Sequence, residues 1–158
     1  ERVRSLILSE FSSDISFIRD YDVSLPEFIV DREKLIQAIL NIARNGAQAM
    51  KLNNQDNMKL SFITRAERQI VFRKKKHATA IRIDIVDNGP GIKNELIDKI
   101  FFPLVTGKEN GSGLGLSLSQ NLISLHQGMI DCHSVPGKTV FSIILPIENN
   151  LMPTKEKK

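Results

Sequence analysis

Apolar residues recur with a helical period between residues 32 and 50, with no proline to interrupt them. Asp31 precedes this run as a good N-cap, and Glu33 complements the positive end of a helix. A second amphipathic helix is predicted over residues 114–127, where Gly128 in a left-handed conformation ends it. A short amphipathic stretch opens the chain at residues 2–11, and residues 94–100 predict one short helix.

Alternating apolar and polar residues predict strands at 15–21, 58–64, 70–72 and 80–86. Near the end of the chain, residues 129–134 and 140–145 predict a hairpin around the turn at 135–137. Helices and strands are therefore mixed along the chain. This order favours an α+β fold, a two-layer α/β sandwich with helices packed on one face of a mixed, mainly antiparallel sheet.

The length and composition are those of one globular domain. The chain has 158 residues, 41% of them apolar and 25% charged, which argues against a disordered or fibrous chain. No apolar run approaches the ~18–20 residues that cross a bilayer. Cys132 is the single cysteine, so an internal disulfide is excluded and a reducing, cytoplasmic compartment is expected. Because Glu1 stands where a start methionine would be, we expect a piece of a longer protein.

The net charge of +4 and a pI near 9.3 raise the hypothesis of a nucleic-acid partner. The basic excess, however, is confined to two segments. Residues 65–76 hold six basic residues against Glu67 alone, and residues 155–158 add three lysines. Phe72 is the one aromatic residue within the first segment, so nucleic-acid binding is disfavoured. A solvated hairpin is the simplest interpretation, and a docking site for a protein partner is the alternative.

Asn41 and Asn45 lie four residues apart on the first predicted helix, so both amides project from one face. Asparagine is costly to bury without partners, and two of them amid isoleucine and leucine indicate a polar role. An amide oxygen is a hard ligand that suits Mg²⁺, which takes few protein ligands and keeps most of its waters. Taken alone, two asparagines that face solvent or cap a loop explain the pattern at least as well.

Residues 87–92 form a glycine-containing loop after a predicted strand. The carboxylate of Asp87 is suited to accept a hydrogen bond from an exocyclic amine such as that of adenine. Gly89 and Gly91 would let the backbone turn sharply and pass close to a flat ring. An ordinary turn of the Asp-x-Gly kind explains the same residues.

A second glycine-rich segment opens the helix predicted at 114–127, with glycines at 111, 113 and 115. Free N–H groups and the positive end of the helix dipole make such a segment a ready phosphate site, and Lys108 could reach a phosphate oxygen. The glycine spacing and the absence of a strand directly before it argue against a dinucleotide-binding unit. This segment holds no Gly-Lys-Ser/Thr triplet, which excludes a Walker A loop there.

The order of these motifs resembles one well-known ATP site, that of the catalytic domains of sensor histidine kinases, in the superfamily of gyrase B and the Hsp90 chaperones. The N, G1, F and G2 boxes of that family read here as residues 41–45, 87–92, 101–103 and 111–116. The resemblance runs from about residue 14 to Pro146. Residues 19–26, 41–45 and 122–123, with the ending at 141–146, look like the nitrogen-regulation branch of the family.

The resemblance implies a role for each matching residue. Asn45 would ligate Mg²⁺, and Asn41 would assist it or the phosphates. Asp87 would read the adenine amine, in a pocket shaped by Gly89, Gly91 and Ile92, with the hydroxyl of Thr139 nearby. Residues 101–113, which include Phe102, would form the mobile lid over ATP. The triphosphate would be held by Gln48, Lys108, Ser112, Gly113, Leu114 and Gly115.

Two residues depart from the family pattern. Gly46 stands where alanine is usual, and Gln48 where many relatives carry a phosphate-binding lysine. In the ATPase relatives, moreover, a water-activating glutamate occupies the position of Asn41. An amide cannot act as a general base, so the domain is expected to offer the γ-phosphate of ATP to an outside histidine, mainly by positioning and charge neutralisation.

The acceptor histidine is expected outside this chain, because none of His77, His126 and His133 is followed by the acidic residue and proline of the family's acceptor segment. Residues 1–13 are interpreted as the trailing part of a dimerisation and phospho-acceptor domain. Residues 14–147 would be the catalytic ATP-binding domain and residues 148–158 a disordered tail. Alone, the chain is expected to be monomeric and unable to phosphorylate itself.

The expected partners are the protein's own dimerisation domain, the receiver domain of a response regulator and a PII-type signal protein. Two alternatives stay open. One is an ATP-hydrolysing clamp of the same superfamily. The other is a regulatory module that binds a receiver or PII-type protein through residues 65–76 without nucleotide.

Overall fold

The computed structural model describes residues 1–11, 15–72, 74–107 and 111–147. Five strands form one sheet in the order β1-β2-β3-β5-β4. β1 is parallel to β2, and the other neighbours are antiparallel. The elements are α1 (Arg2–Phe11), β1 (Ile15–Tyr21), α2 (Arg32–Leu52), β2 (Met58–Phe72), β3 (Lys75–Asp87), α3 (Asn94–Ile97), α4 (Gly115–Leu125), β4 (Met129–Val135) and β5 (Lys138–Pro146).

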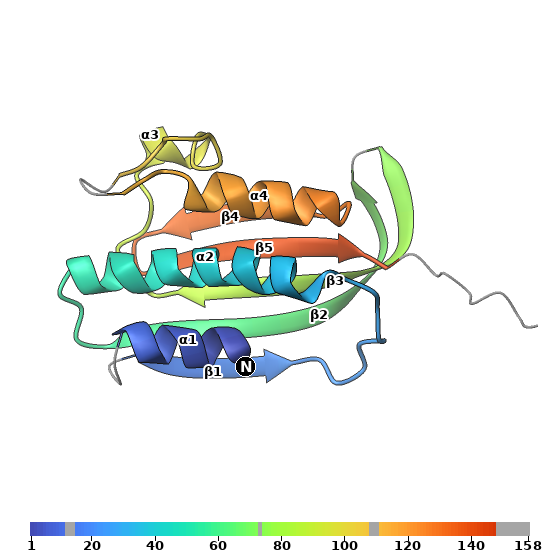
Figure 1. The fold of residues 1–158 in the computed structure, drawn as a ribbon, viewed down its shortest axis with the longest axis horizontal. Helices are drawn as coiled ribbons and strands as arrows, with labels where there is room; N and C mark the ends of the chain where they lie inside the picture. Colours follow the sequence, from blue (N-terminus) through green and yellow to red (C-terminus); the bar gives the residue numbers. More distant parts are fainter. Residues whose placement is uncertain (12–14, 73, 108–110, 148–158) are drawn as a thin grey trace, which may run out of the picture.

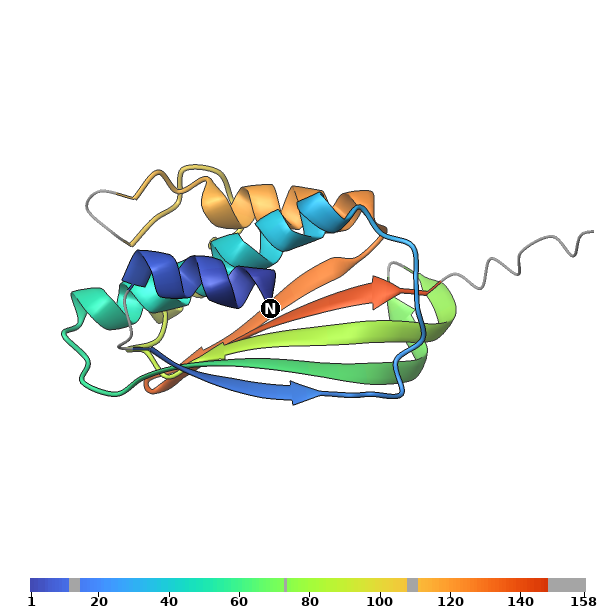
Figure 2. The same cartoon turned by 60° about the horizontal axis from the view of Figure 1, so that its bottom comes forward.

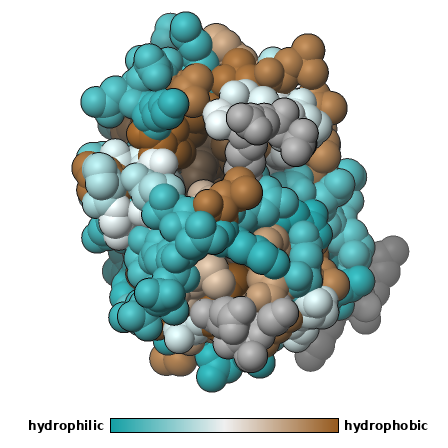
Figure 3. Space-filling model, turned by 90° about the vertical axis from the view of Figure 1, so that its left-hand side faces the viewer, coloured by the Kyte–Doolittle hydropathy of each residue, from teal (hydrophilic) through white to brown (hydrophobic). Residues whose placement is uncertain are grey.

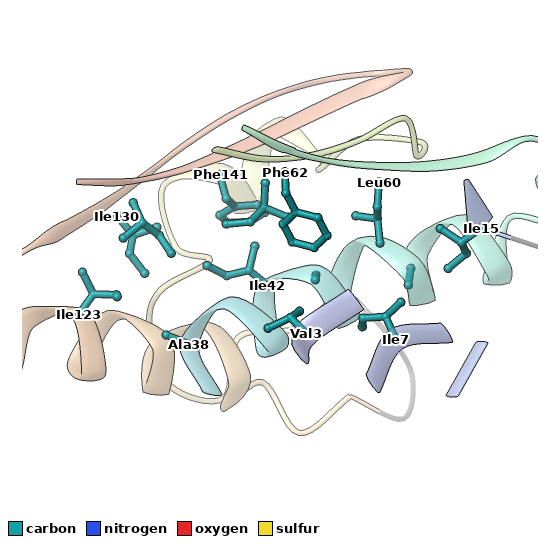
Figure 4. Packing of buried hydrophobic residues seen from close by; sticks show 14 of the residues in the cluster. Val3, Ile7, Ile15, Ala38, Ile42, Leu60, Phe62, Ile123, Ile130 and Phe141 are labelled. Atoms are coloured by element: carbon teal, nitrogen blue, oxygen red, sulfur yellow. The ribbon is translucent and has the colours of Figure 1, made fainter. Parts of the chain in front are cut away.

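The helices cover one face of this sheet (Figures 1 and 2), which confirms the predicted two-layer α+β sandwich. α2 begins where the sequence predicted, because the side chain of Asp31 accepts a hydrogen bond from the backbone N–H of Lys34 at 3.2 Å. Its buried face presents small residues, Ala38, Ala43 and Ala47, which let the helix lie close to its neighbours. Figure 4 shows the apolar side chains that fill the space between the helices and the strands.

α1 belongs to the same core as the sheet. Its residues Val3, Ile7 and Phe11 are buried, and the helix packs against α2. Figure 4 shows Val3 near the α2 residue Ile42, and Ile7 further along, toward Ile15. The assignment of residues 1–13 to a neighbouring domain stays a prediction, and residues 12–14, 108–110 and 148–158, which include Lys108 and the predicted disordered tail, lie outside the described residues.

β2 and β3 form one long hairpin. The strands predicted at 58–64, 70–72 and 80–86 are confirmed, but the predicted interruptions at 65–69 and 75–79 were wrong, because these residues are strand as well. Their pairing runs from Leu60 opposite Asp87 to Phe72 opposite Lys75. β1 pairs with β2 only up to Thr64, and β5 pairs with β3 only from Ala80. In the described part of the chain, residues 68–72 and 75–79 are therefore paired with each other and with no other strand. The polar sequence there reflects a two-stranded ribbon with little buried surface, not a break in the strands.

The end of α4 differs from the prediction. The left-handed residue is Gln127, with a φ of 58°, and not Gly128. The backbone N–H of Gly128 donates to Ile123 O and that of Gln127 to Ser124 O, both at 3.0 Å, which is the Schellman pattern. Gly128 is needed for another reason: a Cβ at this position would lie 2.6 Å from the carbonyl oxygen of Ile144.

Candidate functional site

A cleft of about 1180 Å³ lies between α2, the end of β3, α3 and the start of α4. Figure 3 views the molecule from this end, where brown hydrophobic atoms surround a hollow flanked by teal hydrophilic ones. The segments that line it are far apart in the sequence, and they include all three motifs that the sequence singled out. The predicted residues on its wall are Asn41, Asn45, Gln48, Asp87, Gly91, Ile92, Ser112, Gly113, Gly115 and Thr139.

Asp87, at the end of β3, is a buried carboxylate in the wall of the cleft and is only 7% exposed. Its Oδ1 accepts a hydrogen bond from the backbone N–H of Gly89 at 2.9 Å. Burial raises the pKa of Asp87 above its ordinary value, and the Gly89 hydrogen bond opposes that shift. A Cβ at Gly46 would lie 2.9 Å from Asp87 Oδ2. The glycine at position 46 therefore makes room for this carboxylate.

The loop after Asp87 is held against the turn between β4 and β5. The N–H of Gly137 donates to Gly89 O at 2.9 Å, and the N–H of Ile92 donates to Ser134 Oγ at 2.9 Å. Gly91 has a φ of 85°, and a Cβ there would lie 3.0 Å from the backbone of Val135. This close approach requires glycine.

Thr139 lies directly opposite Asp87 in the pairing of β3 with β5. The Thr139 hydroxyl is 2.9 Å from Ser134 Oγ, which also accepts from the N–H of Ile92. Ser134 therefore joins the loop, the β4–β5 hairpin and the buried hydroxyl of Thr139. Sequence reasoning missed Ser134; the available signal was a polar residue at an inward position of β4, just before the turn.

On α2, the side chains of Asn41, Asn45 and Gln48 follow one another at helical spacing on the wall of the cleft. Asn41 Nδ2 donates to the carbonyl oxygen of Gly115 at 3.3 Å. The buried hydroxyl of Ser119 is 2.9 Å from the same oxygen and 3.2 Å from Ala38 O. These contacts fix the start of α4 against the polar stripe of α2.

Residues 105–107 and 111–113 form the outer wall of the cleft. Gly113 has a φ of 65°, its carbonyl accepts from the N–H of Leu104 at 3.0 Å, and a Cβ there would lie 2.5 Å from the Leu104 carbonyl carbon. Phe102 and Leu114, predicted as site residues, are 59% and 49% exposed and are not part of the wall. Gly89, also predicted as a site residue, is buried and does not line the cleft.

Sequence reasoning missed much of the wall. The cationic side chains Arg44, Lys51 and Lys93 line the cleft, and apolar residues Leu96, Ile100, Val105 and Phe141 supply its inner surface. Phe141 and Ile100 are inward-facing residues that the sequence indicates only as core. Nothing in the local pattern distinguishes a core residue from one that borders a cleft.

The residues present fit a nucleotide with Mg²⁺. Gly113 and Gly115 leave backbone accessible where side chains would otherwise fill the start of α4. Within residues 1–11, 15–72, 74–107 and 111–147, no three His, Cys, Asp or Glu side chains cluster to hold a metal. Mg²⁺ needs no such cluster, because it keeps several waters and takes substrate phosphates as ligands. The side chains of Asn41, Asn45 and Gln48 supply the cleft with amide oxygens, the hard kind of ligand that suits Mg²⁺.

Over residues 30–149 the sequence matches the family described as histidine kinase-, DNA gyrase B- and HSP90-like ATPases. The chain belongs to this family, as the ordered motifs predicted. Among curated proteins it is 48% identical over 147 residues to the sensory histidine kinase/phosphatase NtrB of Vibrio alginolyticus, and 44% identical to the NtrB of Salmonella typhimurium. Each match covers 93% of this chain but only 41% of the relative, so the chain spans about two-fifths of their length.

Solved structures show the same fold. A mycobacterial sensor histidine kinase, MprB, superposes with a TM-score of 0.74 at 22% identity, covering 93% of this chain and 92% of that one. The catalytic domain of histidine kinase ThkA gives 0.69 at 24% identity, covering 92% and 91%. The predicted family and fold are thereby confirmed, including the resemblance to the nitrogen-regulation branch. The helices within the described residues include none with the length and apolar character to span a membrane.

Proposed function

We propose that this chain binds ATP with Mg²⁺ and donates the γ-phosphate to a histidine on a separate dimerisation domain of a nitrogen-regulation type sensor kinase. The buried carboxylate of Asp87 carries the proposal. A carboxylate held by one backbone N–H retains acceptor capacity for a ligand amine. The similarity to the NtrB proteins supports the subfamily.

The base of the nucleotide belongs at the Asp87 side of the cleft. Asp87 accepts a hydrogen bond from the exocyclic amine of adenine. The Thr139 hydroxyl, on the strand paired with β3, is a second polar group on this wall of the cleft. The backbone of Gly91 and the side chain of Ile92 border the ring, and Gly89 orients the carboxylate. Apolar residues Leu96, Ile100 and Phe141 exclude water from the rest of the pocket.

The phosphates belong where α2 meets the start of α4. Asn45 offers its amide oxygen to Mg²⁺, and Gln48, Ser112, Gly113 and Gly115 contact the phosphate chain. Helix α4 contributes its N-terminal N–H groups and its dipole. Asn41 donates a hydrogen bond to the Gly115 carbonyl and thereby positions this turn.

Mg²⁺, when bound, neutralises phosphate charge. Lys108 and the exposed Phe102 and Leu114 would engage as part of the lid over the nucleotide.

Donation to an outside nucleophile is favoured over hydrolysis by the composition of the wall. Among the described residues that line the cleft, Asp87 is the only acid, and none is a histidine. In this proposal Asp87 binds the adenine base, and the amide of Asn41 is not able to remove a proton from water. The cleft therefore positions the γ-phosphate without activating water, which suits transfer to a histidine supplied by another domain.

In this proposal the partners are the protein's own dimerisation domain, a response-regulator receiver domain and a PII-type signal protein. The β2–β3 ribbon is the docking site for a receiver or a PII-type protein. The isolated chain is monomeric and carries no acceptor histidine, so it does not phosphorylate itself. It works in the cytoplasm, the compartment that the single reduced cysteine favours.

The test is calorimetric titration of the chain with a non-hydrolysable ATP analogue, with and without Mg²⁺. We expect Mg²⁺-dependent binding that Asp87→Ala reduces at least about hundredfold, since the buried acceptor and its pocket are lost together. Asp131→Ala, which removes an exposed carboxylate of β4, is the matched control and leaves binding unchanged. Equal affinity in Asp87→Ala and the unmodified chain would refute the proposal.

A second measurement separates the kinase from the ATPase. With γ-labelled ATP, we expect no label on the isolated chain and transfer only after a dimerisation domain is added. Sustained phosphate release that Asp87→Asn abolishes would instead favour the hydrolysing clamp.

A further inference from the structure

The last turn of α1 contacts two cationic side chains of α2 at the rim of the cleft. Glu10 Oε2 accepts a hydrogen bond from Arg44 Nε at 2.8 Å, and Lys51 Nζ lies 5.9 Å from the centre of the Phe11 ring. Arg44 and Lys51 both line the cleft. The two contacts differ in kind. The hydrogen bond to Glu10 fixes the Nε atom of the planar Arg44 guanidinium, whereas the Lys51 ammonium is free to rotate above the Phe11 ring. Arg44 is therefore the cation whose orientation is set.

Arg44 lies next to the polar stripe of α2. It is three residues after Asn41 and four before Gln48, so its Cβ is about 5–6 Å from the Cβ atoms of both. Asn41 contacts the Gly115 carbonyl at the start of α4, and Asn45 Nδ2 lies 3.9 Å from where a Gly115 Cβ would be. Arg44 thus lies beside the phosphate end of the cleft, on the α1 side, and away from the Gly46 face that meets Asp87.

The stripe that Arg44 borders is neutral, since its three members Asn41, Asn45 and Gln48 carry amides. A polyphosphate presents several negative charges there. Mg²⁺ and Lys108 would neutralise part of them, but the amides of the stripe add no positive charge. A guanidinium has five N–H donors in a planar fork. The bond to Glu10 uses one of these donors, that of Nε, and does not occupy the four donors of the two Nη groups.

We propose that Arg44 is a phosphate-binding residue of this cleft, whose Nη groups donate to the outer phosphate oxygens of the nucleotide while Glu10 holds Nε. Glu10 is then a positioning residue, and α1 is a working part of the ATP site. The inference rests on the proposed function, because it assigns the phosphate end of the same site. It also explains how the cleft compensates for an amide at position 48.

A second ion pair between the same two helices provides a matched control. Arg2 Nη1 of α1 contacts Glu33 Oε1 of α2 at 2.7 Å, and both side chains are exposed. Neither residue lines the cleft. Arg2→Gln and Arg44→Gln therefore each remove one exposed α1–α2 pair, but only Arg44→Gln removes a cation from the cleft.

The experiment measures the affinities of ATP·Mg²⁺ and adenosine for the unmodified chain and four variants. We expect Arg44→Gln to weaken ATP binding about tenfold and to leave adenosine binding unchanged, because charge-assisted bonds to phosphate are lost and the base contacts remain. Arg44→Lys keeps the charge without the fork and recovers part of the loss. Arg2→Gln leaves both affinities unchanged. Lys51→Gln removes a rim charge without a fixed contact and weakens ATP binding less than threefold.

Three results would overturn the inference. The first is an Arg44→Gln variant that binds ATP normally while Asp87→Ala does not, which leaves the proposed function intact. The second is an equal loss of ATP affinity in Lys51→Gln, which indicates general electrostatics. The third is an equal loss of adenosine and ATP affinity in Arg44→Gln, which indicates structural damage. Absence of ATP binding by the unmodified chain would overturn both this inference and the proposed function.

Discussion

The hairpin of β2 and β3 joins two regions of opposite character (Figure 1). β3 runs from Lys75 to Asp87, and at about 3.3 Å per residue its ends lie about 40 Å apart. At one end, Asp87 is buried in the wall of the cleft. At the other, Lys74, Lys75 and Lys76 are exposed. The same two strands therefore carry a buried acid at one end and solvated cations at the other.

The difference follows from how the backbone is held. Near Asp87, β3 lies between β2 and β5, and the following loop is bonded to the β4–β5 hairpin at Gly89 and Ile92. At the other end, the described residues of the two strands pair only with each other. A buried charge needs a backbone that is fixed from several sides, whereas solvated lysines need only to be kept apart. Changes at the cleft should therefore affect binding strongly, and changes at the ribbon hardly at all.

Among changes that leave Asp87 in place, the largest expected effect on ATP binding is that of Gly113→Ala. Its Cβ would lie 2.5 Å from the Leu104 carbonyl carbon, so the outer wall of the cleft must move. We expect a loss of order 2 kcal/mol in ATP binding, about thirtyfold, measured by calorimetry. Gly137→Ala is the matched control, since Gly137 also has a positive φ, of 86°, but nothing lies within 4 Å of its added Cβ. It should lower stability by about 1 kcal/mol and keep ATP affinity within twofold. Equal losses of affinity in both variants would contradict this account.

A smaller effect is expected for the stability of Asp87→Asn. Burial raises the pKa of Asp87 in the folded chain above its unfolded value, so the folded state binds the proton more readily. Stability therefore falls as pH rises between the two pKa values, and the penalty is fully present above the folded one. Asparagine carries no charge, so the variant should be more stable than the unmodified chain at pH 7 while losing ATP affinity.

Urea unfolding between pH 4 and pH 8 checks this prediction. The stability difference between Asp87→Asn and the unmodified chain should shrink as the pH falls towards 4. Asp131→Asn, at an exposed position of β4, controls for the loss of one negative charge. A variant that is less stable than the unmodified chain at pH 7 would show that the carboxylate is stabilising in its charged form.

The elements with strong local signals were predictable from the sequence. The N-cap of α2 at Asp31 and the turn at Gly137 each depend on a few neighbouring residues, and both are where they were expected. The ribbon was not predictable as continuous strand, because residues 65–69 are polar on both faces and lack the alternation that marks a half-buried strand. Gln127 was missed because hydrogen bonds to Ile123 and Ser124, not residue type, select the left-handed position.

Within the candidate site, motif residues were predictable and supporting residues were not. Asp87 and Gly113 stand in segments whose glycine content is unusual. Ser134 and Arg44 stand in ordinary strand and helix sequence, and only the tertiary contacts with Ile92 and Glu10 give them a place in the site. The assigned roles of the motif residues stay predictions until binding is measured.

The smallest expected effect on nucleotide binding tests the other end of the hairpin. Replacing Lys74, Lys75 and Lys76 by glutamine removes three charges about 40 Å from Asp87, several times the Debye length of about 8 Å in physiological salt. ATP affinity should therefore change less than twofold.

Binding to an acidic protein partner should instead weaken and lose its dependence on salt, because the ribbon supplies the cationic contact. Surface plasmon resonance against a receiver domain and a PII-type protein, at low and high salt, measures this. A tenfold change in ATP affinity with partner binding intact would mean that the two ends of the hairpin are coupled through the sheet, and the comparison between an anchored end and an independent ribbon would no longer hold.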